Sequence, residues 1–384
     1  MKRARQIFLI ITLLCFRLYA FSQDVSFIVL GDLHYDRIED HDMDYVKTRP
    51  QDLKQIMEEY PQYTSKYMSK FLHLIKNQTL AITPSVKAVA QLGDLVEGVA
   101  GNLVLAKKMD QEAVDLLNSV DIKVPWILIK GNHDVSNSPG QPEAWREIIC
   151  PFIEGQVKKK IRNGMYTFKI SDEVELFVLD QFFSVDQNLP ESEMVSFLES
   201  AFAKSTATYK FVLTHQPVIP VTDHCWHLLS GIRRPVQDST LRNRFLNLLG
   251  KNKAIVLCAH LHQYSVLSRQ TPSGPVVQIM VNSVISSFDS RSPKKTETAY
   301  KGGEWVKSNP DWQPFNQDIR FRILEEEKKY VNNFFKTDLP GYCILSIHTK
   351  AHNIMMNYYN GFSVKPSQTI NITDLQHNMQ NKNL

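Results

Sequence analysis

Residues 25–34, with the sequence VSFIVLGDLH, decide the fold. The first six side chains are apolar or small and do not alternate with charged ones, which is typical of a strand covered on both faces. Gly31 follows this run, and Asp32 and His34 come directly after it. Because residues two apart on an extended segment point the same way, these two side chains can face one centre.

The pattern of the first strand repeats along the chain. Further apolar runs rich in Val, Ile and Leu lie at 86–92, 124–129, 176–179, 211–213 and 254–259. Between them, apolar residues recur at helical spacing at 106–120, 191–204 and 241–249. Strands that alternate with helices predict a layered α/β protein.

Asp, Asn or His residues also follow four of the other predicted strands. They are Asp94 after Gly93, Asn132-His133-Asp134 after Gly131, His215 after Thr214, and His260 with His262 after Ala259. Open α/β sheets place their sites at the carboxyl ends of their strands, so we expect these side chains to converge. Imidazole nitrogens combined with carboxylate and amide oxygens suit Zn, Mn or Fe. Seven of these residues form a candidate ligand set that is too large for one tetrahedral zinc but suits two neighbouring divalent ions: Asp32, His34, Asp94, Asn132, His215, His260 and His262.

This ordered set of motifs resembles that of the calcineurin-like metallophosphoesterases. It runs from Asp32 to His262, with Ala259 in a position where the family usually has glycine. The resemblance implies two divalent metal ions, with Mn, Fe or Zn all possible. It also implies that a hydroxide bridging the two metals attacks a phosphate ester.

The resemblance further assigns a role to each matching position. It implies that one metal is bound by Asp32, His34 and His262, the other by Asn132, His215 and His260, and that Asp94 bridges both. It implies that His133 is not a ligand but contacts the phosphoryl group and assists the leaving oxygen, and that Asp134 orients the His133 imidazole.

The expected family fold is two mixed β-sheets packed as a sandwich with helices outside. We expect one catalytic domain at residues 23–365, with a hairpin formed by 342–348 and 354–359, followed by a polar C-terminal tail at 366–384. Within the domain, 288–336 is the least family-like part, and we expect a substrate-binding lid with aromatic walls that include Trp305 and Trp312. The alternative is that the helix predicted at 319–335 packs on the sheet.

The N-terminus is typical of a signal peptide. Lys2, Arg3 and Arg5 precede an apolar run of about half the length that a membrane-spanning helix needs, and Ala20 and Ser22 suit cleavage before Gln23. We therefore expect residues 1–22 to be removed, the protein to be periplasmic or extracellular, and no stable membrane insertion afterwards. Residues 1–22 hold four of the 44 basic residues and none of the 40 acidic ones, so the remainder carries no net charge and gives no indication of a nucleic-acid partner.

The sequence predicts hydrolysis of a phosphomonoester or phosphodiester, on a small molecule or a polymer. A sulfatase-like or nucleotide-pyrophosphatase specificity on the same metals is the alternative among enzymes. From another class, the alternative is a catalytically silent metal-binding protein that recognises a glycan or a protein partner through the Trp305–Trp312 region.

Three features remain open. Residues 34–44, rich in acids and histidines, indicate either a third cation site, a substrate-facing loop or a solvated polar loop. Residues 224–234, which include Arg233 and Arg234, are either an oxyanion-binding segment or a surface loop. The four cysteines after residue 22 favour no more than one disulfide, and the sequence does not predict the oligomeric state.

Overall fold

A computed structural model of the chain describes residues 23–135, 138–161, 164–182, 191–230, 239–285, 295–310 and 316–377. The predicted signal peptide, Arg233, Arg234 and Trp312 lie outside these ranges. In the described residues, no helix is both long enough and apolar enough to span a membrane.

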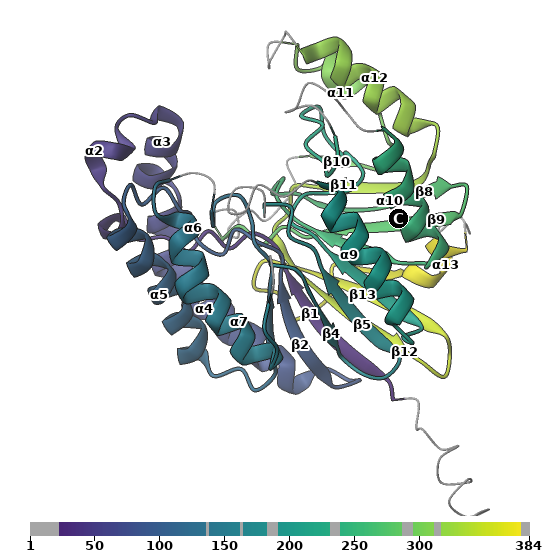
Figure 1. The fold of residues 1–384 in the computed structure, drawn as a ribbon, viewed down its shortest axis with the longest axis horizontal. Helices are drawn as coiled ribbons and strands as arrows, with labels where there is room; N and C mark the ends of the chain where they lie inside the picture. Colours follow the sequence, from purple (N-terminus) through teal and green to yellow (C-terminus); the bar gives the residue numbers. More distant parts are fainter. Residues whose placement is uncertain are drawn as a thin grey trace, which may run out of the picture.

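Two mixed β-sheets form the centre of the molecule, as predicted (Figure 1). The first sheet has the order β14 (Gln368–Asn371), β13 (Asn353–Asn360), β12 (Gly341–His348), β1 (Val25–Leu30), β2 (Val86–Gln91) and β3 (Trp126–Leu128). The second has the order β10 (Thr296–Glu297), β11 (Val331–Thr337), β8 (Tyr264–Thr271), β9 (Gly274–Met280), β7 (Ile255–Cys258), β6 (Tyr209–Leu213), β5 (Val174–Val178) and β4 (Tyr166–Lys169).

Parallel pairing of neighbouring strands within each sheet explains why the polar motifs lie at the same end of both sheets. Strands β1, β2 and β3 are mutually parallel, and so are β5, β6, β7 and β9. Antiparallel strands complete both sheets, including the predicted hairpin of β12 and β13, which pairs with β1.

Helices cover the outer faces of the two sheets (Figure 1). On the side of the first sheet lie α2 (Met43–Val46), α3 (Pro50–Glu58), α4 (Tyr60–Ala81), α5 (Leu103–Val120), α6 (Gln141–Ala144), a π-helical turn (Trp145–Ile149) and α7 (Cys150–Val157), with a 3₁₀ turn at Ile38–Asp40. On the side of the second lie α9 (Glu191–Lys204), α10 (Ser239–Lys251), α11 (Glu304–Lys307) and α12 (Gln317–Lys328), and α13 (Ile372–Gln376) contacts β13, β9 and β8.

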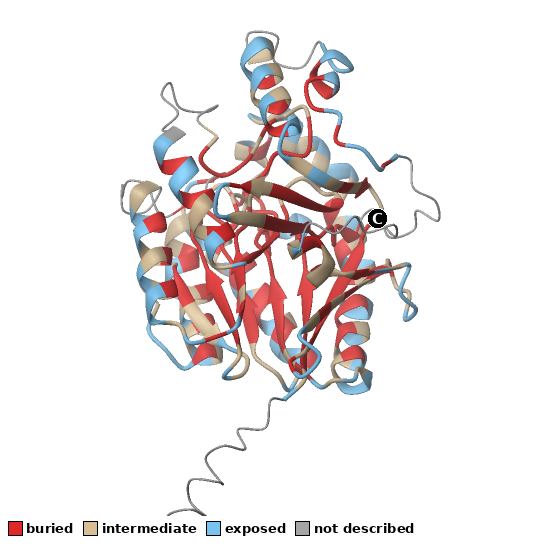
Figure 2. Cartoon of the chain, turned by 90° about the vertical axis from the view of Figure 1, so that its right-hand side faces the viewer, coloured by how far each residue is buried: buried red, intermediate tan, exposed pale blue. Residues whose placement is uncertain are grey.

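Burial on both faces accounts for the unbroken apolar runs of the central strands (Figure 2). In β6, Phe211 and Leu213 belong to the core between the sheets, whereas Val212 belongs to the core under α9 and α10. Phe27 of the first sheet meets Phe211 of the second edge to face, with ring centroids 5.0 Å apart. The sandwich is therefore packed directly, sheet on sheet.

The region expected to be a lid is part of the second sheet instead. The predicted helix at 319–335 ends at Lys328, and β11 follows it and pairs with β8. Trp305 is 3% exposed and packs against Tyr300 and Phe334. The Trp305 indole is therefore held in the core and not on a mobile lid, and of the two alternatives the described residues support packing on the sheet.

The predicted polar tail is wrong for residues 368–376. Strand β14 pairs with β13, and α13 begins directly after it. Ile370, Ile372 and Leu375 are fully buried, so these residues complete the core of the domain. The four described cysteines are free thiols, which agrees with the expected scarcity of disulfides.

Candidate metal centre

The seven predicted ligands lie on loops at one end of the two sheets. The loops follow β1 (Asp32, His34), β2 (Asp94), β3 (Asn132), β6 (His215) and β7 (His260, His262). The structure brings these side chains together in two adjoining groups.

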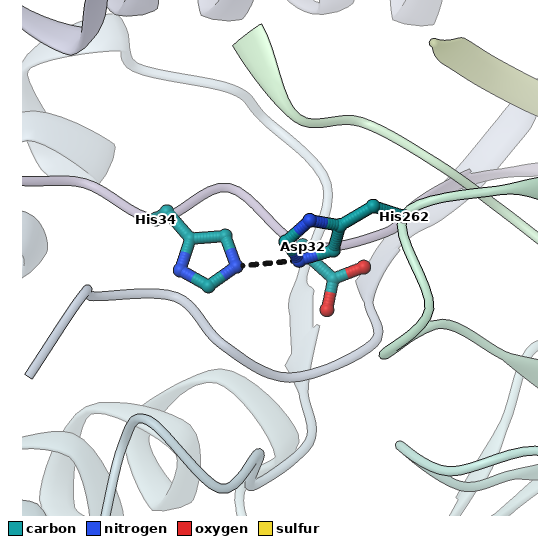
Figure 3. A group of neighbouring side chains, drawn as sticks. All are labelled: Asp32, His34 and His262. Carbon is teal, nitrogen blue, oxygen red and sulfur yellow. Dashed lines mark hydrogen bonds between the residues drawn. The ribbon is translucent and has the colours of Figure 1, made fainter. Parts of the chain in front are cut away.

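The first group consists of Asp32, His34 and His262. Each offers a donor atom, and the three atoms lie within 4.8 Å of one another. Nε2 of His34 lies 2.9 Å from Nε2 of His262, and the Asp32 carboxylate lies beside the His262 ring (Figure 3).

The second group consists of Asp94, His215 and His260, again with donor atoms within 4.8 Å. Nδ1 of His260 lies 3.1 Å from Nε2 of His215, and Oδ1 of Asn132 is also 3.1 Å from Nε2 of His215. All four residues that the resemblance assigns to the second metal or to the bridge are thus neighbours.

Asp94 stands between the two groups. Its Oδ2 is 3.2 Å from Nε2 of His215 and 4.0 Å from Nε2 of His34. A single carboxylate therefore reaches both sets of imidazoles, which is the position that a bridging ligand requires.

Contacts on the remote side of two rings fix their orientation. Nδ1–H of His215 donates to the carbonyl of Leu92 (2.8 Å), and Nδ1 of His34 lies 2.7 Å from Oε2 of Glu97. Carbonyls and carboxylates behind a histidine leave Nε2 as the ligating atom and increase its basicity.

Burial and mutual charge shift the pKa values of the grouped side chains. Burial raises the pKa of Asp32 to about 7. Burial, with the neighbouring His133, lowers the pKa of His34 to about 3. Burial opposes a charge on His215 as well, but the carboxylates of Asp94 and Asp32 outweigh it and raise its pKa to about 9. Cations here would favour ionised carboxylates and neutral imidazoles, the forms that bind metals.

The backbone around the site adopts costly conformations. His34, Asp94, His260 and His262 all have φ in the left-handed region, between 46° and 75°. Such a conformation costs a non-glycine residue about 1–3 kcal/mol, and residues that adopt it often cluster at functional sites. Gly131 is required for a different reason, because a Cβ there would lie 2.1 Å from Oδ1 of Asp94.

His133 lies at the edge of the two groups, with its side chain 17% exposed. Its backbone N–H donates to Oδ1 of Asp94 (2.8 Å), and its Nδ1–H donates to the carbonyl of Glu97 (2.7 Å). His133 also forms a third group with His34 and Asp94 within 4.8 Å. The ring is thus within reach of the cluster, and its assignment as a non-ligand stays a prediction.

The contacts of Asp134 differ from those expected. Its carboxylate accepts backbone N–H groups, with Oδ2 taking those of Gly131 (2.7 Å) and Asp94 (2.9 Å), and Oδ1 taking those of Leu95 (2.9 Å) and Val96 (3.2 Å). The prediction that Asp134 orients the His133 imidazole is therefore wrong in this structure. Asp134 instead fixes the loop that carries Asp94 to the loop that carries Asn132.

Glu97 is a site residue that the motifs did not reveal. It is fully buried, and its Oε2 lies 2.7 Å from Nδ1 of His34 and 3.5 Å from Nδ1 of His133. Burial raises its pKa well above the usual range. The available signal was an acidic residue within the otherwise apolar and small segment 95–100, three positions after Asp94.

The polar stretch at 34–44 is a solvated loop only in part, because residues 37–39 and Asp44 are exposed. Asp36, Asp40 and His41 are buried, and Nε2 of His41 lies 2.6 Å from Oδ1 of Asp36. On the opposite side, the ring of Trp226 tilts against His260, with centroids 5.6 Å apart. Trp226 therefore lies beside the histidine cluster, and the buried pair of Asp36 and His41 follows His34 closely in the chain.

The donor set fits two divalent cations. Ring nitrogens of four buried or half-buried histidines point at one another and at carboxylates, at separations of 2.9–4.0 Å. Nitrogens with lone pairs directed at one another repel unless a proton or a cation lies between them. The N/O composition suits Mn, Fe or Zn.

Comparisons with known proteins agree with this geometry. The sequence profile of the calcineurin-like phosphoesterase family matches residues 25–264. A search of curated proteins found no match.

Among solved structures, a PhoD structure superposes with a TM-score of 0.50 at 14% identity, covering 92% of this chain and 69% of its own. Purple acid phosphatase PPD1 from yellow lupin (Lupinus luteus) seeds superposes with a TM-score of 0.51 at 10% identity, covering 94% of this chain. This chain spans 57% of the length of the lupin protein. At such identities the superpositions show the shared fold, whereas the sequence match extends over more than half of the chain. The chain therefore belongs to the calcineurin-like phosphoesterase family.

Proposed function

We propose that the protein is a dinuclear-metal phosphoesterase that hydrolyses a phosphomonoester or phosphodiester. The observation that carries this proposal is the position of Asp94, whose Oδ2 lies between the two histidine groups. Two bound divalent ions would supply a hydroxide nucleophile near neutral pH and would stabilise charge on the phosphoryl oxygens.

The residues of the site have two further roles, metal binding and proton donation. Asp32, His34 and His262 would hold one ion, and Asn132, His215 and His260 would hold the other. His133 would donate a hydrogen bond to the phosphoryl group and a proton to the departing oxygen.

The pKa of His133 supports its role as a proton donor. Burial opposes its charge, but the carboxylates of Glu97 and Asp94 outweigh the burial and raise the pKa above the usual 6.5. A raised pKa favours the protonated imidazole, which is the form that a general acid requires.

The test is hydrolysis of para-nitrophenyl phosphate and of bis(para-nitrophenyl) phosphate with added Mn, Zn or Fe. The control is Asp94→Asn, which keeps the size of the side chain and removes the shared charge. We expect turnover of at least one ester in the wild type and none in the control. Absence of turnover with every metal, in folded and metallated protein, would favour the silent metal-binding protein.

We also propose that the protein acts outside the cytoplasm, and residues 1–22 support this. The N-terminus of protein recovered from the source cells should be Gln23. Recovery of the intact chain with Met1 would contradict export by a cleaved signal.

A further inference from the structure

A small polar cavity of about 250 Å³ lies between β11, the loop before β8 and the segment around α11. We call it the lysine pocket. The side chains that line it include Thr222, Gln263, Lys295, Trp305 and Lys336.

The pocket is close to the predicted metal ligands. Gln263 follows His262 directly, and Lys336 pairs with Ser265 across β11 and β8. With at most about 3.6 Å per residue and about 4.8 Å between strands, the Cα atoms of Lys336 and His262 lie within roughly 15 Å. A substrate of modest size can therefore span both places.

Positive charge predominates around the pocket. Lys295, Lys301 and Lys336 all surround the carboxylate of Glu297, with N–O distances of 3.3, 3.8 and 3.6 Å. Of these lysines only Lys295 and Lys336 line the pocket, and the one carboxylate in the described lining is that of Asp223, so two ammonium groups face one carboxylate there. A ligand that neutralises this positive charge is an anion, and binding of a further cation is disfavoured.

The charge of the innermost lysine persists at neutral pH. Lys336 is 5% exposed, and its ammonium donates to the carbonyl of Val221 (3.0 Å) and lies 4.2 Å from the centre of the Trp305 ring. Burial lowers its pKa to about 8, so most molecules carry the charge at pH 7.

One hydroxyl in the pocket wall lacks a partner. Thr222 is 6% exposed, and its Oγ1, which can donate to an anion, makes no hydrogen bond among the described residues. A buried hydroxyl without a partner costs about 1–3 kcal/mol, so such groups in a cavity indicate a ligand or water that satisfies them.

From these contacts we propose that the lysine pocket binds a second phosphate group of the substrate. This inference rests on the proposed function, because it assigns the cleaved ester to the metal centre and the retained phosphate to Lys295, Lys336 and Thr222. The preferred substrates are then organic bisphosphates. Lysine is a frequent phosphate ligand because it presents a compact charge with three donors.

The first arm of the test compares turnover of bisphosphates of linear diols of increasing length with turnover of the matching monophosphates. We expect kcat/KM for the best bisphosphate to exceed that of its monophosphate by about tenfold or more, with an optimum at one chain length. Equal values at every length would overturn the inference and leave the proposed function intact if para-nitrophenyl phosphate is still hydrolysed.

The second arm uses a matched pair of variants, Lys295→Met and Lys301→Met. Both remove a mostly exposed lysine that neighbours Glu297, but only Lys295 lines the pocket. Lys295→Met should reduce the preference for the bisphosphate at least fivefold, and Lys301→Met should leave it within twofold. Thr222→Val, which keeps the shape of the side chain, should also reduce the preference. Equal effects of the two lysine variants would show a general electrostatic effect and contradict the pocket.

The third arm requires no turnover. Metal-free protein is titrated with inorganic phosphate by calorimetry, and we expect millimolar binding that Lys295→Met weakens and Lys301→Met does not. If this holds while no ester is hydrolysed, the proposed function fails but the pocket is a site for free phosphate. Binding that is insensitive to Lys295→Met would contradict the pocket itself.

Discussion

At the scale of single residues, adjacent positions in one loop have different roles. Asn132, His133 and Asp134 follow one another, yet Asn132 points at His215, His133 lies at the edge of the cluster and Asp134 binds four backbone N–H groups. Each role can be tested by one substitution.

His133→Ala should separate catalysis from metal binding. Loss of a general acid reduces turnover by about 10²-fold or more, while the predicted ligands remain in place. Turnover of para-nitrophenyl phosphate and metal content of the purified protein are the two readouts. The surface variant His73→Ala, in α4, serves as the control. Loss of metal together with activity would show that His133 is a ligand, as its proximity to His34 and Asp94 permits.

Asp134→Asn should weaken metal binding. The new amide would place N–H groups against the backbone N–H groups of Gly131 and Asp94, so the loop that carries the bridging carboxylate would shift. Loss of a contact behind a ligand typically costs 10–100-fold in metal affinity.

Competition with a metal-binding dye measures this affinity, and Asp121→Asn, with an exposed side chain, is the matched control. Unchanged metal affinity in Asp134→Asn would contradict this account.

At the scale of elements, a buried ion-pair triad joins α10, α12 and β8. Glu327, in α12, accepts from Arg242 of α10 (2.7 Å) and from Arg269 of β8 (2.6 Å), and all three side chains are buried. Burial alone would raise the pKa of Glu327, but the two guanidinium groups lower it to about 2.

Glu327→Gln should destabilise the protein by about 3 kcal/mol at neutral pH, because two buried guanidinium groups lose their counter-charge. The folded-state pKa lies below the unfolded value of 4.5, so the stabilisation is present above pH 4.5 and is lost as the pH falls towards 2. Urea unfolding of both proteins across this pH range measures the difference. The neighbouring variant Glu326→Gln, at an exposed position, should have little effect at any pH. A loss of stability that is as large near pH 2 as at pH 7 would contradict this account.

At the scale of elements, the strands also show which sequence patterns are sufficient to predict an element. The runs at 25–30, 86–92 and 254–259 are strands because both faces of each are buried, which leaves an unbroken apolar signature. Strand β11 (VNNFFKT) was missed because it follows α12 directly and mixes polar with aromatic residues, so its pairing with β8 depends on tertiary contacts. The same applies to β14, whose four residues include one buried apolar side chain.

At the scale of the whole molecule, the arrangement of two sheets explains why the site could be predicted. Strands β1–β3 and β6–β7 end at one edge, so residues up to 230 positions apart meet there, as His262 meets Asp32. The sequence predicts that these side chains lie together because each motif directly follows a recognisable strand. Glu97 and the lysine pocket follow no motif, and their role depends on distances that a sequence does not contain.

The central claim is that two metals act together across Asp94. The measurement that tests it most directly is a titration of metal-free protein with Mn²⁺ while hydrolysis of para-nitrophenyl phosphate or its bis-ester is followed. The account predicts that activity requires the second equivalent of metal per chain and that Asp94→Asn stays inactive throughout. Full activity with one equivalent, or activity that survives in Asp94→Asn, would contradict it.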